Sequence, residues 1–107
     1  MAADPELVER LHALLAAEPA LELKKMFGGV GFMVDGHLTV CALSGGGLIA
    51  RVGREAVSGL LGPAVEQMVN GERPMTGWVR VSQEACEDDD ELSAWVRRCL
   101  EFVRTLD

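Results

Sequence analysis

Six basic side chains and two glycines in the middle of the chain have the residue types needed to hold an anion. Lysine and arginine donate hydrogen bonds to phosphate or carboxylate oxygens, and glycine-rich backbone can approach such a group closely. These residues are Lys24, Lys25, Gly28, Gly29, Arg51, Arg54, Arg73 and Arg80. If the fold brings them together, they form a modest basic cluster and a candidate surface for a ligand or a partner. The alternative, which we favour, is that they are unrelated charges facing solvent.

The histidines and cysteines do not form a catalytic or metal-binding pattern. His12 and His37 belong to no His-x-x-x-His spacing, so we predict neither a metal site nor catalytic residues and expect both histidines at the surface. Cys41 and Cys99 fall in apolar patterns, where a thiol acts as a small hydrophobe. We expect Cys86 to be exposed in an acidic loop, whose carboxylates would raise its pKa, the wrong direction for a nucleophile.

The glycine-rich segments lack the motifs of nucleotide binding and of serine hydrolases. The glycines after Phe27 do not complete Gly-x-Gly-x-x-Gly, because Val34 stands where the third glycine is required. Ser44 precedes three glycines instead of lying within Gly-x-Ser-x-Gly, and we interpret it as a turn residue. The acidic run 87–91 lacks the alternating ligands of a calcium loop and is typical of a solvated helix start. We therefore expect no cofactor.

Length, charge and cysteine content describe one small soluble domain, residues 1–107. A chain of this size buries roughly 60 to 70% of the surface that it exposes when unfolded. Net charge is −7, and a pI near 4.7 argues against nucleic-acid binding. The acids gather in residues 1–23 and 81–107, whereas residues 24–80 are slightly basic. Without a secretory signal, a membrane-spanning run or a disulfide framework, the expected location is the cytoplasm.

The periodicity of apolar residues predicts the elements that must position these side chains. Asp4 caps a helix with Leu7, Leu11, Leu14 and Leu15 on its core-facing side. Beyond Pro19, which ends this helix, the pattern predicts extended segments at 21–27, 30–34, 37–43 and 48–52, a short helix at 54–61 and a last strand at 78–81. A long helix follows, capped at Asp88, with an apolar stripe through Leu92, Trp95, Val96, Cys99, Phe102, Val103 and Leu106.

A two-residue hairpin turn at Asp35-Gly36 fixes an expected strand register. It pairs Val34 with His37, Phe32 with Thr39 and Val30 with Cys41 on one face. On the other face it pairs Met33 with Leu38 and Gly31 with Val40. Both faces are partly apolar, and helices cover one of them. The other face meets a second layer or a partner, which suggests a homodimer through the sheet.

Two motifs, which occur here in the same order as in a known family, connect the chain with that family. Met26-Phe27-Gly28-Gly29 before the Asp35-Gly36 turn, and Arg73-Pro74-Met75 leading into Gly77-Trp78, resemble the TfoX/Sxy N-terminal domain of bacterial competence regulators over about residues 24–106. The resemblance implies an α+β fold similar to type III secretion chaperones. We accordingly predict an antiparallel sheet of about five strands with flanking helices, in the order α-β(3)-α-β(2)-α. Full-length regulators carry a second, C-terminal domain that this chain is expected to lack.

Two functions of different class follow. The first is a non-enzymatic protein-interaction or regulatory module, as the family resemblance implies, with an unidentified protein partner and possible dimerisation through the sheet. It is motivated by the missing catalytic set and by the two-sided sheet. The second is a small enzyme or a binding domain that holds an anionic metabolite with the basic cluster and the glycine-rich backbone. We prefer the first.

Overall fold

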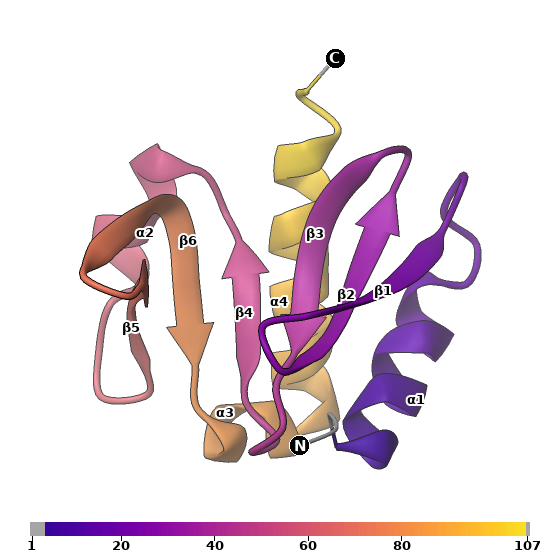
Figure 1. Ribbon diagram of the computed structural model, residues 1–107, viewed down its shortest axis with the longest axis horizontal. Helices are drawn as coiled ribbons and strands as arrows, with labels where there is room; N and C mark the ends of the chain where they lie inside the picture. The colour runs from indigo at the N-terminus through magenta and orange to yellow at the C-terminus, as the bar shows by residue number, and fades with distance from the viewer. Residues whose placement is uncertain (1–3, 107) are drawn as a thin grey trace.

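A six-stranded antiparallel sheet, with helices packed on one face, makes up the domain in a computed structural model that describes residues 4–106 (Figure 1). The elements in chain order are α1 (Pro5–Leu15), β1 (Glu22–Met26), β2 (Gly29–Val34), β3 (His37–Ala42), β4 (Leu48–Arg51), α2 (Arg54–Leu60), β5 (Val65–Asn70), β6 (Arg73–Val81), α3 (Gln83–Glu87) and α4 (Asp89–Val103). The strand order across the sheet is β1-β2-β3-β4-β6-β5. The α+β fold class is confirmed.

The sheet has six strands where about five were predicted, and the order is α-β(4)-α-β(2)-α-α instead of α-β(3)-α-β(2)-α. Strand β5 lies in a segment for which the sequence showed no clear alternation, and the predicted extended segment 21–27 ends one residue earlier, at Met26. Phe27 and Gly28 form a second tight turn, with φ angles of 53° and 73°. The Asp35-Gly36 turn is confirmed, with φ angles of 50° and 83°.

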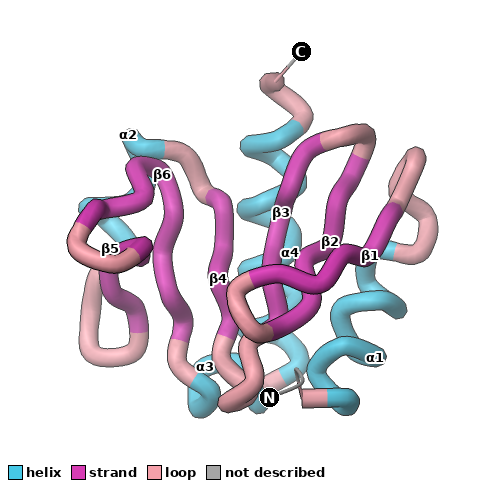
Figure 2. The backbone as a smooth tube through the Cα atoms, in the orientation of Figure 1, coloured by secondary structure: helices cyan, strands magenta, loops and turns pink. Residues whose placement is uncertain are grey.

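The main core lies between the sheet and the helices. Alternate residues of β2, β3, β4 and β6 point toward α1 and α4, where Phe32, Val40 and Val79 are fully buried. In α1, the predicted core residues Leu7, Leu11 and Leu15 are buried, but Leu14 is 39% exposed because the domain covers only a narrow stripe of this helix. The helices thus form one layer behind the sheet (Figure 2).

A β-bulge at Thr39 corrects the predicted hairpin register. The pairs Val34–His37 and Met33–Leu38 form as expected, but Phe32 lies opposite Val40, Gly31 opposite Cys41 and Val30 opposite Ala42. Thr39 is the extra residue; it is fully buried, and its hydroxyl donates to the carbonyl oxygen of His37 at 3.1 Å. The expected pairs of Thr39, Cys41 and Val40 are therefore wrong by one position.

The second face of the sheet has a small core of its own. Cys41, Leu43 and Ile49 are buried there, with Met26, Met68 and Trp78 packed against them. Strand β1 folds over this face, since the thiol of Cys41 lies 3.7 Å from the carbonyl oxygen of Met26 although β2 separates the two strands in the sheet. The edge strands themselves therefore cover part of the face that no helix covers.

The two predicted helix caps, Asp4 and Asp88, are confirmed. The Asp4 carboxylate accepts from the Glu6 N–H at 3.0 Å, and the Asp88 carboxylate accepts from the Glu91 N–H at 2.9 Å. Between β6 and Asp88 lies α3, which no sequence pattern predicted. Among residues 4–106, no helix combines the length and apolar composition that crossing a membrane requires.

Candidate functional site

The eight candidate residues are spread over the sheet and its turns. Lys24 and Lys25 lie on the edge strand β1, whereas Arg73 and Arg80 lie on β6, with β2, β3 and β4 in between. Gly28 and Gly29 belong to the β1–β2 turn and the start of β2. Arg51 ends β4 and Arg54 begins α2. The structure thus brings Arg51 and Arg54 to one end of the sheet and puts the lysines on a different strand.

The Arg51 guanidinium fills a gap between β3 and β4. These strands pair only as far as Val40 and Ala50, and beyond that point they part (Figure 2). Arg51 donates from Nη1 to the carbonyl oxygen of Leu38 at 3.3 Å. Its guanidinium carbon lies 5.3 Å from the ring centre of Trp78 and 5.7 Å from that of Phe102. These cation–π contacts give Arg51 a structural role between the two layers.

The close contacts around two motif glycines are also internal. A Cβ on Gly29 would lie 1.8 Å from the carbonyl oxygen of Ala42, so only glycine lets β2 and β3 approach this closely. Gly77 has a φ of 89°, and its carbonyl oxygen accepts from the N–H groups of Val52 and Gly53 at 2.9 and 3.0 Å. What approaches the glycines in the family motifs is therefore the chain itself.

Arg80 lies in a pocket of about 510 Å³ at the end of the sheet. The glycines of the β3–β4 turn and the segment after α2 supply backbone to its wall. The lining residues are Leu43, Gly45, Gly47, Gly62, Pro63, Ala64, Val65, Glu66, Arg80, Val81, Ser82 and Gln83. Glu66 is the cross-strand neighbour of Arg80, so a carboxylate offsets the charge that would attract an anion.

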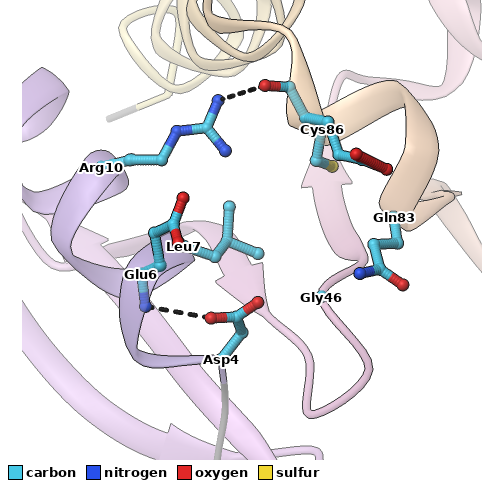
Figure 3. A pocket seen from close by; sticks show the side chains of 8 residues that line it. Asp4, Glu6, Leu7, Arg10, Gly46, Gln83 and Cys86 are labelled. Atoms are coloured by element: carbon cyan, nitrogen blue, oxygen red, sulfur yellow. Dashed lines mark hydrogen bonds between the residues drawn. The ribbon is translucent and has the colours of Figure 1, made fainter.

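A second pocket, of about 300 Å³, lies between α1, the β3–β4 turn and α3 (Figure 3). Its walls are mostly polar and carry more acids than bases. They comprise Asp4, Glu6, Leu7, Arg10, Gly46, Gln83, Cys86 and Glu87. The Asp4 carboxylate is engaged as a helix cap, and Arg10 donates to the carbonyl oxygen of Glu87 at 3.2 Å.

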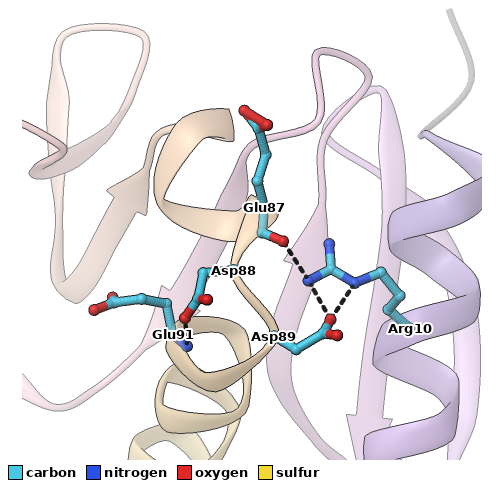
Figure 4. A network of polar contacts seen from close by, with 5 residues as sticks. All are labelled: Arg10, Glu87, Asp88, Asp89 and Glu91. Carbon is cyan, nitrogen blue, oxygen red and sulfur yellow. Dashed lines mark hydrogen bonds and ion pairs between the residues drawn. The ribbon is translucent and has the colours of Figure 1, made fainter.

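Arg10 joins α1 to the start of α4. Its Nε and Nη2 donate to one carboxylate oxygen of Asp89 at 3.1 and 2.8 Å (Figure 4). The Arg10 side chain is 22% exposed and that of Asp89 is 91% exposed. No sequence pattern points to Arg10, because its partner Asp89 is 79 positions away and no local spacing relates the two.

The cysteines have the chemistry of buried thiols. Cys86, expected to be exposed, is 1% exposed because α3 turns it into the core. Burial raises its pKa to about 11, opposed in part by the Arg10 guanidinium; the acidic neighbours invoked from the sequence are not the cause. Burial likewise raises the pKa of Cys41 to about 11. At neutral pH neither thiol has the thiolate character of a nucleophile.

The histidines do not come together with acids into a ligand set. His12 is exposed and His37 is half-buried. In the part of the chain that the structure describes, no group of three or more histidine, cysteine, aspartate and glutamate side chains is arranged to hold a metal ion.

Four large apolar side chains are exposed near the two edge strands, two at each edge. Leu23 and Phe27 are 42% and 41% exposed in β1 and the turn after it. On the other side of the sheet, Leu61 and Val69 are 47% and 48% exposed, before and within β5. Phe27 also has a left-handed backbone, which is unfavourable for a residue with a Cβ and is normally the place of glycine or asparagine.

A family model matches most of the chain that forms this α+β domain. The family model of the TfoX N-terminal domain matches residues 13–103, and the chain belongs to the TfoX N-terminal domain family. No curated protein and no solved structure matches the chain. The match begins within α1 and ends with α4, so it covers the whole sheet.

Proposed function

We propose that this domain is a non-enzymatic protein-interaction module with a regulatory role, resembling in this the competence regulators of its family. The observation that carries the proposal is the set of exposed apolar side chains at the sheet edges, Leu23, Phe27, Leu61 and Val69. Leu23 and Phe27 lie at one edge of the sheet and the other two at the opposite edge, so each edge offers a pair of apolar side chains for contact with a protein. The strained backbone of Phe27 supports the proposal, because a costly conformation at an exposed position is often kept for function.

The partner in this proposal is another protein, and a second copy of the chain through the sheet is one form of it. The exposed rim of the sheet would make that contact, since edge strands and the side chains of Met26, Met68 and Trp78 cover the centre of the second face.

Capture experiments with matched surface variants test this function. Tagged wild-type protein and the variants Leu23→Ser, Phe27→Asn and Val69→Ser are used to capture proteins from lysate, quantified by mass spectrometry. Leu14→Ser is the control, because Leu14 is 39% exposed but belongs to α1 and to neither edge strand. We expect one set of partners to be lost from the edge variants and retained by the control. A strictly monomeric protein with the same captured background in every variant would contradict the proposal.

The second candidate, an anionic metabolite, depends on the pocket that contains Arg80 and glycine backbone. A thermal-shift screen of nucleotides, sugar phosphates and carboxylates tests it, since a ligand at one hundred times its dissociation constant adds about 2.7 kcal/mol of stability. A response that Arg80→Gln abolishes and Arg54→Gln leaves intact would support this candidate. The absence of any response across the screen would retire it.

A further inference from the structure

In the part of the chain that the structure describes, strand β1 pairs with β2 alone, and the hairpin geometry shows which backbone groups of its free edge point outward. Met26 and Gly29 close the two-residue Phe27-Gly28 turn, so they form a hydrogen-bonded pair. The register to β2 then continues without a shift through Glu22 and Met33. Hydrogen-bonded and non-hydrogen-bonded pairs alternate along an antiparallel ladder. Lys24 and Glu22 therefore bond to β2, whereas the N–H and C=O groups of Leu23 and Lys25 point away from the sheet.

The side chains of the same strand are arranged symmetrically around Leu23. Glu22 and Lys24 lie opposite Met33 and Gly31 and share one face of the sheet, and Leu23 points to the other face. All three are exposed, with Leu23 at 42%. The strand thus presents an acid, an apolar residue and a base in sequence, with unpaired backbone groups at the central position.

We propose that the β1 edge binds the β1 edge of a second copy of this chain, in an antiparallel arrangement centred on Leu23. The two Leu23 residues would exchange both backbone hydrogen bonds and pack side chain against side chain. On the other face, Glu22 of each copy would lie directly opposite Lys24 of the second copy. The contact contains two reciprocal pairs of opposite charge and is self-complementary, as a two-fold interface requires.

Other registers with outward-pointing backbone groups are less favourable. A two-fold centred on Lys24 would place the two Lys24 side chains directly opposite one another, and one centred on Lys25 would do the same for Lys25. Like charges in directly opposite positions destabilise a strand pair. Charge complementarity therefore selects the register centred on Leu23. Lysines often protect edge strands from pairing, but here Glu22 supplies the opposite charge at the matching position.

A proline substitution at the centre of β1 should abolish pairing between two copies without removing a hydrogen bond inside the domain. The inference rests on the proposed function, since it specifies one partner of the interaction module. Sedimentation equilibrium of the wild-type protein is expected to show a monomer–dimer equilibrium. Leu23→Pro removes an outward-pointing N–H and no bond to β2, so the variant should stay folded by circular dichroism and become monomeric. Leu14→Ser is the control, and it should dimerise as the wild-type protein does. Leu14→Pro would not serve as a control, because a proline there would break α1.

Charge reversal tests the register itself. Lys24→Glu places two acids opposite one another at both ends of the contact and should weaken dimerisation about tenfold. The double variant Glu22→Lys/Lys24→Glu restores opposite charges and should return the dissociation constant to within about threefold of the wild-type value.

Three outcomes would overturn the inference: a wild-type protein that is monomeric at every concentration reached, a dimer that survives Leu23→Pro, or a double variant that dimerises no better than Lys24→Glu. None of these outcomes would by itself contradict the proposed function, which fails on the capture experiment. A monomer that still captures a partner through Leu23 and Phe27 would leave the interaction module standing and remove self-pairing from it.

Discussion

Arg51 donates a hydrogen bond across the split in the sheet to the carbonyl oxygen of Leu38, at 3.3 Å. The ladder between β3 and β4 has already ended where these two residues meet, so the side chain takes the place of a missing backbone bond. Trp78 of β6 and Phe102 of α4 hold the guanidinium by stacking. A residue that the sequence suggested for ligand binding thus connects three strands and a helix.

Replacing Arg51 should therefore cost stability. Arg51→Met keeps the aliphatic stem but removes the hydrogen bond and both cation–π contacts, and we expect a loss of about 1–2 kcal/mol in the free energy of unfolding. Urea denaturation followed by tryptophan fluorescence measures it. Arg54→Met is the matched control, because Arg54 is exposed, and it should change stability by less than about 0.5 kcal/mol. Equal effects of the two variants would refute the structural role of Arg51.

Gly29 is expected to tolerate no side chain. In Gly29→Ala the new Cβ would lie 1.8 Å from the carbonyl oxygen of Ala42, a backbone atom that can move only with its strand. We expect a loss of about 3 kcal/mol or more, or no folded protein, by urea denaturation and circular dichroism. Gly45→Ala should be nearly neutral, since a Cβ there meets no atom within 4 Å. A stable, native-like Gly29→Ala protein would contradict the close strand contact.

The buried thiols make stability depend on alkaline pH. The pKa of Cys86 rises from 9.0 to about 11 in the folded protein, as does that of Cys41, because burial favours the neutral thiol. Their contribution is complete below the pKa of the unfolded chain and is lost as pH rises through 9 toward 11. Each thiol lowers the free energy of unfolding by at most about 1.4 kcal/mol per pH unit within this window.

Urea midpoints at pH 7.5, 9 and 10.5 check this dependence, and the chain has no tyrosine to titrate in the same range. The Cys86→Ala variant should show a flatter decline than the wild-type protein. A thiol reagent at pH 7.5 should label the unfolded protein much faster than the folded one. Rapid labelling of Cys86 in the folded state would show that the thiol is not buried.

Replacing Arg10 and replacing Asp89 should lower the stability of the domain by different amounts, although the two residues form one contact. Asp89 is 91% exposed, so Asp89→Asn should cost no more than about 1 kcal/mol, and less at high salt. Arg10→Met also loses the hydrogen bond to the carbonyl oxygen of Glu87, and it should destabilise the domain more and lose less of its effect in salt. Denaturation at low and high sodium chloride compares them. A larger loss of stability in Asp89→Asn than in Arg10→Met would contradict this prediction.

Local patterns predicted the elements that depend on local chemistry. The caps at Asp4 and Asp88 and the turn at Asp35-Gly36 follow from side chains and backbone within a few residues, and all three are present. The apolar stripe of α4 is buried at Leu92, Trp95 and Val96, with Leu100 as a further buried residue that the spacing did not single out. The family motifs likewise predicted the α+β class.

Local sequence patterns could not predict contacts between segments that are distant in the chain. The bulge at Thr39 shifts a register that the turn alone appeared to fix, and the only local sign is a threonine amid apolar residues. Cys86 is buried because α3 packs against the rest of the domain, and its acidic neighbours suggested the opposite. Whether the basic residues share a site depended on the strand order, in which β4 lies next to β6 and β1 lies at the far edge.

Gly77 accepts hydrogen bonds from two N–H groups where the chain passes from β4 to α2, and Gly29 allows the close approach of Ala42. The most recognisable residues of this chain therefore stabilise its fold. Their contacts lie within the domain and say nothing about binding preference. We therefore expect changes at these glycines to alter stability, and changes along the rim of the sheet to alter recognition.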